Sequence, residues 1–372
     1  MSTAKWLQKV GRPLRQGNFF RRVFSLAATE EPVHTDKVDL DWDNLKFEYQ
    51  PTDTFRVHRW TKAKGWDTGT SVQGATFALS PMCPALHYGQ QAFEGLKAFE
   101  TASGDINVFH PNDSNAARMN ASCERMLMPE VPIDLFNEAV VTAVQENRRW
   151  VPPYLKGSLY IRPFIIGTGS QLALAPASEF TFAVLVMPVG NYFTASGNGL
   201  NALVMEDFDR AATRGTGAVK VGGNYGADLL PNAVCHERGF DTCLYVDSEK
   251  QRFIEEFSVA NFAAIAEDGS YVTPKATNVL PSITNTSLMQ LASDAGLNVE
   301  RRPVPIAELS SLREVAAIGT AVVVNPIGSV TVGETCTKFD YPDTLVSLKD
   351  TLLGVQNGDA PDVHDWLLPV PE

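Results

Sequence analysis

The chain has 372 residues, of which 44% are hydrophobic and 20% are charged, and its formal net charge at pH 7 is −12. This length allows two domains of ordinary size, and the acidity argues against nucleic acid as a partner, because such proteins present a concentrated basic surface. No run approaches the ~20 apolar residues that cross a bilayer, and five scattered cysteines without a C-x-x-C pair predict neither a disulfide framework nor a metal site.

The first 29 residues depart from this acidic balance. They contain six Lys and Arg residues and no acidic residue before Glu30, and Trp6, Leu7, Val10 and Leu14 recur at roughly helical spacing. An Arg-rich, acid-poor, amphipathic leader is typical of a mitochondrial transit peptide, which we predict for residues 1–30. The alternative is a disordered basic tail on a cytoplasmic protein.

Residues 31–190 mix strand and helix signals and form a predicted small N-terminal domain. Apolar patterns predict strands within Val38–Val57 and at Ala75–Leu79, Leu96–Glu100, Ile106–Phe109, Leu159–Ile166 and Phe180–Pro188. Helical periodicity predicts helices at Asp113–Met128 and Leu135–Trp150, the second of them capped by Asp134. We therefore expect an antiparallel sheet with two helices.

The glycines and polar residues of 191–199 predict a linker to a large C-terminal domain, residues 200–372. Strands are predicted there at Leu200–Met205, Thr242–Val246, Ala263–Ala266 and Val315–Val324, and helices at Asn224–Arg238 and Thr284–Leu297. The fold class is therefore mixed α/β, with two domains. A cleft between two domains is a common ligand site.

The most specific segment surrounds Lys220, which stands between Gly215-Thr216-Gly217 and Gly222-Gly223, just before a predicted helix. Glycines let the backbone approach another group closely, and few side chains crowd the amine. A lysine that attacks a carbonyl carbon must first lose its proton, and this setting suits such covalent chemistry. Alone, the segment is better explained as a glycine-rich loop with a solvated lysine.

Glu255 and Glu256 stand at the head of the apolar segment Ile254–Phe262. A buried carboxylate needs a cationic partner to stay ionised, and a protonated pyridine nitrogen is such a partner. Taken alone, two glutamates at the end of a strand are ordinarily surface residues.

Three further features suit a phosphate group. Ile283 and Thr284 open a predicted helix, whose N-terminus offers free N–H groups and a partial positive charge. Thr320, in the turn Gly319-Thr320-Ala321, adds a hydroxyl, and Arg118 adds a guanidinium that binds phosphate through two N–H groups. Separately, Thr284 is explained as a helix cap and Arg118 as a solvated helical residue.

Together with His87–Phe99 and Ser158–Pro163, these motifs resemble branched-chain amino-acid aminotransferases of the fold-type IV class of pyridoxal-phosphate enzymes, in the family's order and at compatible spacings. The resemblance runs from about Phe47 to Val330. It implies the cofactor pyridoxal 5'-phosphate in the interdomain cleft, amino acids and 2-oxo acids as small-molecule partners, and a homodimer. The implied reaction is transamination of leucine, isoleucine and valine with 2-oxoglutarate.

The resemblance also implies a role for each motif residue. Lys220 forms the Schiff base and moves the proton, Tyr225 bonds the cofactor's phenolic oxygen, and Glu256 faces the pyridine nitrogen. The phosphate is held by Arg118, Ile283, Thr284 and Thr320. The substrate pocket is lined by Tyr88, Phe93, Tyr160, Arg162 and Ala321, with Arg162 for the distal carboxylate of glutamate and the Thr320–Ala321 turn for the α-carboxylate. A loop near Tyr88 reaches the neighbouring subunit's site.

Two departures from the family pattern bear on specificity. Phe257-Ser258-Val259-Ala260 follows Glu256 where glycine and methionine are usual, and Thr213-Arg214-Gly215 stands in place of Pro-Gly-Gly. Alternatives are therefore an amine or specialised-metabolite aminotransferase of the same fold and, from another class, a non-catalytic cofactor-binding paralogue. A nicotinamide-dependent enzyme is disfavoured, because Gly167-Thr168-Gly169 lacks the third glycine of G-x-G-x-x-G.

Overall fold

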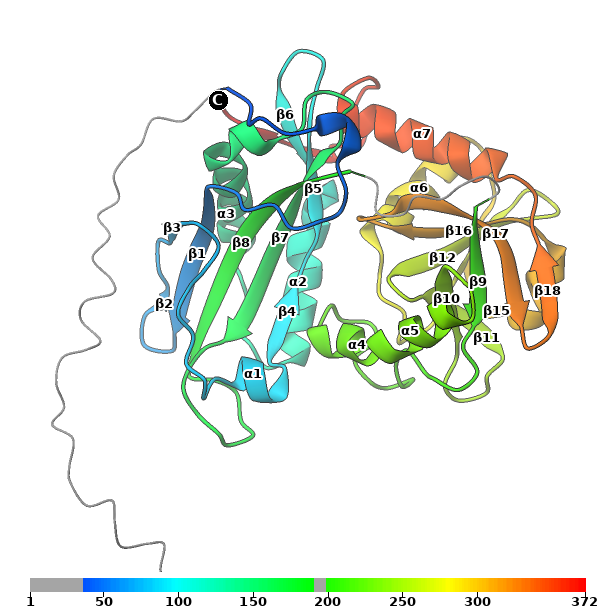
Figure 1. The fold of residues 1–372 in the computed structure, drawn as a ribbon, viewed down its shortest axis with the longest axis horizontal. Helices are drawn as coiled ribbons and strands as arrows, with labels where there is room; N and C mark the ends of the chain where they lie inside the picture. Colours follow the sequence, from blue (N-terminus) through cyan, green and yellow to red (C-terminus); the bar gives the residue numbers. More distant parts are fainter. Residues whose placement is uncertain (1–35, 191–198) are drawn as a thin grey trace, which may run out of the picture. The chain divides into compact units, whose positions relative to one another are not determined.

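The computed structural model describes residues 36–190 and 199–372, so the predicted transit peptide and residues 191–198 of the predicted linker lie outside the described residues. The described chain forms two sheets with helices packed against them (Figure 1). Within these ranges no helix is both long and apolar enough to span a membrane.

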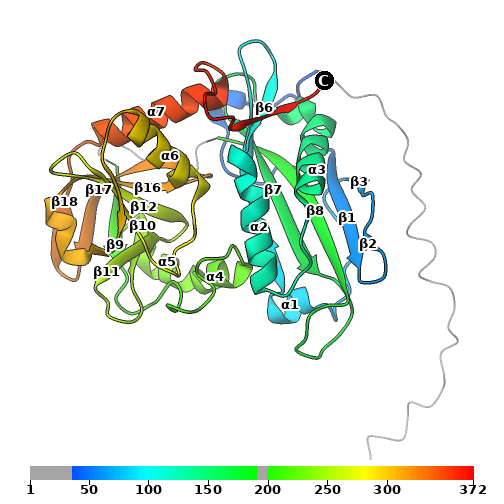
Figure 2. The same cartoon turned by 180° about the vertical axis from the view of Figure 1, so that it is seen from behind.

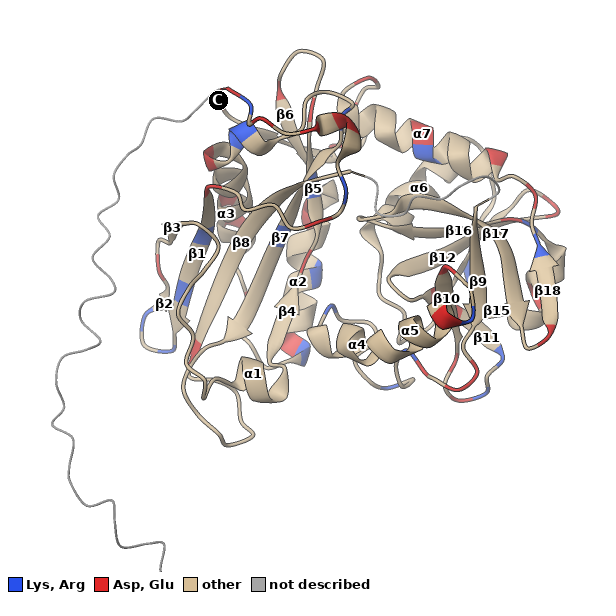
Figure 3. Ribbon diagram, viewed as in Figure 1, with Lys and Arg blue, Asp and Glu red and all other residues tan. Residues whose placement is uncertain are grey.

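The first sheet is entirely antiparallel, and its main path runs β19-β6-β5-β7-β8-β1-β2, with β3 paired to β1 and β4 to β7. Its strands are β1 (Thr54–Thr61), β2 (Gly65–Trp66), β3 (Thr70–Gln73), β4 (Gln91–Phe93), β5 (Leu96–Glu100), β6 (Ile106–Phe109), β7 (Ser158–Gly167), β8 (Glu179–Val189) and β19 (Leu367–Val370). Charged positions are sparse on its long strands (Figure 3): β7 carries only Arg162 and β8 only Glu179.

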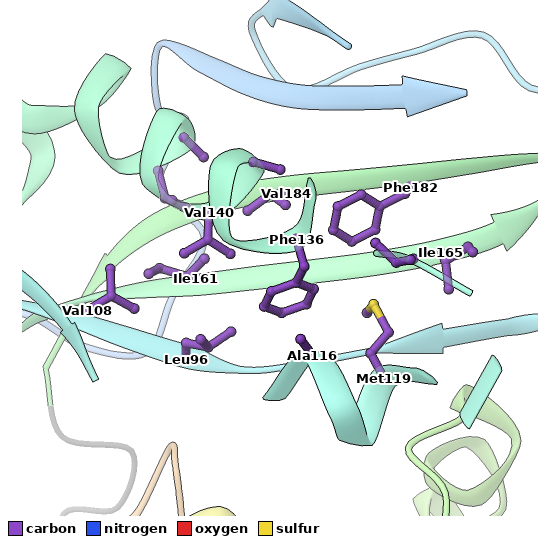
Figure 4. Packing of buried hydrophobic residues seen from close by; sticks show 14 of the residues in the cluster. Leu96, Val108, Ala116, Met119, Phe136, Val140, Ile161, Ile165, Phe182 and Val184 are labelled. Carbon is purple, nitrogen blue, oxygen red and sulfur yellow. The ribbon is translucent and has the colours of Figure 1, made fainter. Parts of the chain in front are cut away.

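One face of this sheet is covered by α2 (Ser114–Arg125) and α3 (Ile133–Glu146), as Figure 2 shows, and α1 (Pro84–Tyr88) contacts β7. Phe136 of α3 and Met119 of α2 are fully buried and belong to one cluster with Leu96, Ile161 and Phe182 of the strands (Figure 4). Each such side chain stabilises the fold by about 1.5–3 kcal/mol through loss of apolar surface to water. This core fixes the strands whose opposite face carries Tyr160 and Arg162.

The second sheet is mixed, with parallel pairs β9–β10, β9–β17 and β13–β14 among antiparallel ones. Its strands are β9 (Leu200–Val204), β10 (Thr242–Val246), β11 (Phe253–Phe257), β12 (Ala260–Ala266), β13 (Tyr271–Pro274), β14 (Val299–Arg302), β15 (Val304–Pro305), β16 (Leu312–Gly319), β17 (Val323–Val332) and β18 (Thr335–Lys338). The helices in this part of the chain are α4 (Gly222–Ala227), α5 (Leu229–Glu237), α6 (Ile283–Asp294) and α7 (Asp343–Asn357). Along the whole described chain, 3-10 helices occur at η1 (Trp42–Asn44), η2 (Pro111–Asp113), η3 (Arg148–Trp150) and η4 (Ile306–Ser311).

Both sheets belong to one compact unit, Thr35–Glu372. A shared core cluster contains Phe99 and Phe109 of the first sheet, Ile318 of the second, and Leu288 and Leu352 of α6 and α7. The C-terminal strand β19 pairs with β6, so the last residues of the predicted 200–372 domain join the first sheet. The division into two domains stays a prediction.

Most predicted strands and helices are confirmed to within a few residues, but five assignments are wrong. Residues 38–53 contain η1 and no strand, and 75–79 are largely exposed and unpaired. Asp134 does not cap α3, which begins after Pro132 and has Asp134 in its first turn. The helix predicted at 224–238 is two helices that meet at Asp228, and the strand predicted at 315–324 is interrupted after Gly319.

Candidate active site

Lys220 lies just before α4, where the local fold holds its backbone on both sides. Its N–H donates to Ser122 Oγ at 2.9 Å, and its carbonyl accepts from Phe93 N at 3.0 Å. The amine Nζ donates to the hydroxyl of Tyr225, in the first turns of α4, at 2.9 Å. A Cβ on Gly222 would overlap the side-chain amide of Gln91, which would have to move. Lys220 and Tyr225, for which the resemblance implies separate roles toward the cofactor, are therefore in direct contact.

Phe93 separates the amine from a guanidinium. Lys220 Nζ and Arg162 Cζ each lie 4.8 Å from the centroid of the Phe93 ring. Arg162 also lies against the ring of Tyr160, 5.2 Å from its centroid, and donates to the Tyr160 hydroxyl at 3.1 Å. Its Nε is buried and finds no acceptor among the described residues. Phe93, Tyr160 and Arg162 thus form one wall that continues to Lys220.

Glu256 lies on β11 and is only 3% exposed. Its Oε1 forms an ion pair with Arg210 Nη1 at 2.7 Å and accepts from Leu280 N at 3.0 Å, while Oε2 accepts from Asn261 Nδ2 at 3.2 Å. Burial raises the pKa of Glu256, and the charge of Arg210 is the largest effect that opposes it. Lys220 also acts to lower this pKa, which indicates that the amine and the carboxylate share one electrostatic environment.

The start of α6 offers the predicted anion site. Ser282 caps the helix by accepting from Asn285 N, so it leaves the N–H groups of Ile283 and Thr284 without an acceptor among the described residues. Both residues are buried, which keeps these donors away from bulk water. Arg118 Nη1 donates to the Pro281 carbonyl at 2.8 Å, so the guanidinium lies beside this helix start. A cavity of about 330 Å³ adjoins it, lined by residues of α2 and α6.

Arg118 is not the solvated helical residue that its position alone suggested. Its Nε and Nη2 donate to the two carboxylate oxygens of Glu94 at 2.7 and 2.8 Å. Glu94 is fully buried, and Asn115 Nδ2 donates to it at 2.9 Å. Burial by itself raises the pKa of Glu94, but the charge and hydrogen bonds of Arg118 outweigh it, and the pKa is lowered. Arg118 is therefore held rigidly, with one edge toward α6.

The turn Thr320–Val322 connects β16 to β17 and contains two of the predicted site residues. Val323, which follows it, has φ 57°, a left-handed conformation that is strained for a β-branched residue. The Ala321 carbonyl accepts from Lys97 Nζ at 3.3 Å. Thr320 and Ala321 are partly exposed, so their backbone groups remain accessible to a ligand.

Tyr88 is the predicted site residue that the structure does not bring to this cluster. Its side chain at the end of α1 is 41% exposed, and its hydroxyl donates to the Leu172 carbonyl. Its role at a neighbouring subunit's site stays a prediction.

Sequence reasoning missed the buried partners of the predicted residues. Glu94 lies inside the quoted motif at 87–99, yet its pairing with Arg118 depends on how β4 and α2 meet in space. Arg210 has no motif around it, and nothing in the local sequence shows that the Asn261 amide reaches Glu256. Two adjacent glutamates before an apolar run were the one available signal, because a buried pair needs a cation nearby.

The assembled groups fit pyridoxal phosphate. An amine beside a phenol suits its carbonyl and phenolic oxygen, a buried carboxylate suits its ring nitrogen, and free N–H groups at a helix start beside a guanidinium suit its phosphate. At the far end of this wall, the guanidinium of Arg162 is a group that suits a carboxylate.

Comparison with known protein families matches residues 91–330 to the amino-transferase class IV family. A branched-chain-amino-acid aminotransferase of Helicobacter pylori is 42% identical over 336 residues, which cover 89% of this chain and 98% of that protein. The branched-chain amino acid aminotransferase 1, mitochondrial, of Humulus lupulus is 37% identical over 341 residues, covering 91% and 86%.

Solved structures share the fold. The branched-chain amino acid aminotransferase from Escherichia coli superposes with a TM-score of 0.71 at 24% identity, over 86% of this chain and 100% of that one. The branched-chain amino acid aminotransferase from Thermobaculum terrenum in its PLP-bound holo form gives a TM-score of 0.69 at 21% identity, over 85% and 98%.

Proposed function

This chain belongs to the amino-transferase class IV family, and we propose from that premise that it transfers amino groups between branched-chain amino acids and 2-oxoglutarate. The products are branched-chain 2-oxo acids and glutamate. One observation carries the proposal: the Lys220 amine and the Arg162 guanidinium lie on the same aromatic ring, each 4.8 Å from its centroid. One pocket can thus present an apolar wall and a carboxylate-binding group next to the reacting amine.

The cofactor is pyridoxal 5'-phosphate, which when bound supplies an electron-withdrawing ring that stabilises negative charge at the substrate Cα. We assign its ring nitrogen to Glu256, its phenolic oxygen to Tyr225, and its phosphate to Arg118, Ile283, Thr284 and Thr320. The charge of Arg210 opposes the effect of burial on the pKa of Glu256 and so favours the carboxylate form that a protonated ring nitrogen requires.

Lys220 has two tasks in this proposal. It holds the cofactor covalently, and once released it is the base that removes the proton from the substrate Cα. Tyr225 Oη, 2.9 Å from Nζ, holds the amine in place for both tasks. The turn at Thr320 and Ala321 binds the substrate α-carboxylate through backbone N–H groups, and Arg162 binds the distal carboxylate of glutamate or 2-oxoglutarate.

Replacing Lys220 with Ala tests the assignment. The variant is expected to lose both the visible absorbance of the lysine-bound cofactor and turnover with leucine and 2-oxoglutarate. Lys275→Ala, which changes an exposed lysine, is the matched control and should retain both. Steady-state turnover by the Lys220 variant would contradict the proposal.

The preferred amino donor needs a direct test, because the segment that follows Glu256 departs from the family pattern. Val259 in this segment is 40% exposed, so its side chain is open to a bound substrate. A panel of amino donors with 2-oxoglutarate as acceptor should rank leucine, isoleucine and valine first. A preference for simple amines would instead favour the amine aminotransferase alternative.

We also propose a homodimer in which Tyr88 serves the neighbouring site. Mixed subunits provide the test, since a dimer of one Lys220→Ala and one Tyr88→Ala protomer contains one site with both residues intact. Partial recovery of activity on mixing two inactive variants is expected. A monomer in solution, or no recovery, would contradict this arrangement.

A mitochondrial location is proposed from the basic leader at residues 1–30, and relatives from plants include proteins named mitochondrial. Fusion of residues 1–32 to a fluorescent reporter should direct it to mitochondria. The same fusion with Arg12, Arg15, Arg21 and Arg22 changed to Gln is the control. A cytosolic reporter with the native leader would contradict the proposal.

A further inference from the structure

Lys97 is a buried lysine that the proposed reaction does not yet use. It lies on β5 opposite Tyr160 of β7 and is 7% exposed. Its Nζ makes a hydrogen bond of 3.3 Å to the Ala321 carbonyl. Among the described residues no carboxylate lies within ion-pair distance of it.

A buried cation without a counter-ion is rare, because desolvation of the charge is costly unless an anion or several hydrogen bonds compensate for it. Burial, followed by repulsion from Lys349, lowers the pKa of Lys97 to about 8. The amine therefore remains largely protonated near neutral pH. Within residues 36–190 and 199–372, the amine has one neutral acceptor, which belongs to the turn between β16 and β17.

The backbone of this turn must be held in place by contacts with its surroundings. Val323 at its end is held in the left-handed region, and such strain persists only where the surroundings fix the backbone. A charged donor on the Ala321 carbonyl fixes the plane of that peptide group and strengthens its dipole. The N–H groups of the turn then keep one orientation and carry more positive charge, which suits binding of an anion.

We propose that Lys97 is a positioning residue for the substrate α-carboxylate: it holds the turn at Ala321 in the geometry that binds this group, and the bound carboxylate balances its charge. The inference rests on the proposed function, because it needs a substrate with an α-carboxylate at this turn. It assigns to Lys97 a task distinct from the covalent task of Lys220.

Three substitutions separate the hydrogen bond from the charge. Lys97→Met removes both, Lys97→Gln keeps a donor without charge, and Lys97→Arg keeps the charge. Lys349→Met is the matched control, since it removes the neighbouring lysine and leaves the turn untouched. Cofactor absorbance and thermal unfolding of each purified protein establish that the variants are folded and loaded.

The measured quantity is the dissociation constant of 4-methylvaleric acid, a branched carboxylate without an amino group, beside that of its neutral amide. Lys97→Met is expected to raise the dissociation constant of the acid by about 10- to 100-fold and that of the amide little. For the acid, the dissociation constant of Lys97→Gln should lie between those of Lys97→Met and wild type, and that of Lys97→Arg should be closest to wild type. Lys349→Met should leave this dissociation constant unchanged. The KM for leucine should rise in Lys97→Met while kcat changes less.

Each outcome decides between the two proposals. If wild type binds the acid and Lys97→Met binds it equally well, or loses only thermal stability, the assignment of Lys97 is wrong and the proposed function stands. If loaded wild type binds neither the acid nor leucine, the proposed function fails and the role of Lys97 fails with it. If Lys97→Met weakens binding of the acid and of the amide equally, the pocket has lost its structure, and this outcome also overturns the assignment.

Discussion

Arg210 Nη1 forms an ion pair with Glu256 Oε1 at 2.7 Å, and the two side chains are only 5% and 4% exposed. Leu280 N approaches the same oxygen at 3.0 Å, so Oε1 is satisfied from within the protein. In the described part of the chain, Oε2 has only the longer contact to Asn261 Nδ2, at 3.2 Å. Arg210 therefore orients Glu256 so that one oxygen remains for a further hydrogen-bond donor.

Breaking this pair from one side is expected to destabilise the fold strongly. Arg210→Met leaves the Glu256 carboxylate buried without its cation, and such a loss costs about 3–5 kcal/mol. The double variant Arg210→Met with Glu256→Gln should recover much of the lost free energy of unfolding, because no charge is then left unpaired. Urea unfolding of the cofactor-free proteins measures both values. A single variant as stable as wild type would show that water or a rearranged side chain replaces Arg210.

Glu255 is expected to make stability depend on pH near neutrality. Burial raises its pKa from 4.5 to about 7, against a hydrogen bond from Asn278 and with a further increase from the charge of Glu256. The folded state keeps the proton that the unfolded state has lost, so the free energy of unfolding falls as pH rises from 4.5 to about 7. The loss is on the order of 2 kcal/mol and levels off at higher pH.

Glu255→Gln is the matched comparison, because the amide cannot ionise. The difference in free energy of unfolding between this variant and wild type should grow across that pH interval, as followed by urea unfolding at fixed ionic strength. A constant difference would mean that Glu255 titrates normally.

Gly95 is expected to tolerate no side chain. A Cβ at this position would overlap the Tyr160 hydroxyl, which is packed against Phe47 and bonded to Arg162. Gly95→Ala should displace Tyr160 and Arg162 together and weaken binding of 2-oxoglutarate about tenfold or more, with cofactor absorbance retained. Gly226→Ala is the control, since a Cβ there meets open space in helix α4. Unchanged 2-oxoglutarate affinity in Gly95→Ala would place the carboxylate elsewhere.

Local pattern was sufficient where a segment's structure depends on its own residues. The strands at 96–100, 106–109 and 242–246 have the predicted bounds. Pro231 already argued against one helix over 224–238, because proline fits only the first turn of a helix, and α5 indeed begins two residues before it.

Long-range packing decided the remainder. The alternation near Phe47 reflects contact of its ring with Tyr160, 5.1 Å away, and not strand pairing. Strand β19 exists because β6 offers it an edge, about 260 residues earlier in the chain. The pairs Arg118–Glu94 and Arg210–Glu256 likewise join distant segments, so local spacing predicted the site's reactive groups and missed the residues that hold them.

Arg162 is expected to discriminate between the two substrates. Its guanidinium is fixed by Phe93 and by the Tyr160 hydroxyl, and its buried Nε lacks an acceptor among the described residues. Arg162→Met removes the partner of the distal carboxylate, so the KM for 2-oxoglutarate should rise about 10- to 100-fold, whereas leucine, which has no second carboxylate, is affected far less. Separate half-reactions with leucine and with glutamate, followed by cofactor absorbance, measure the two effects. An equal loss for both amino acids would indicate that Arg162 acts on the α-carboxylate or on the pocket as a whole.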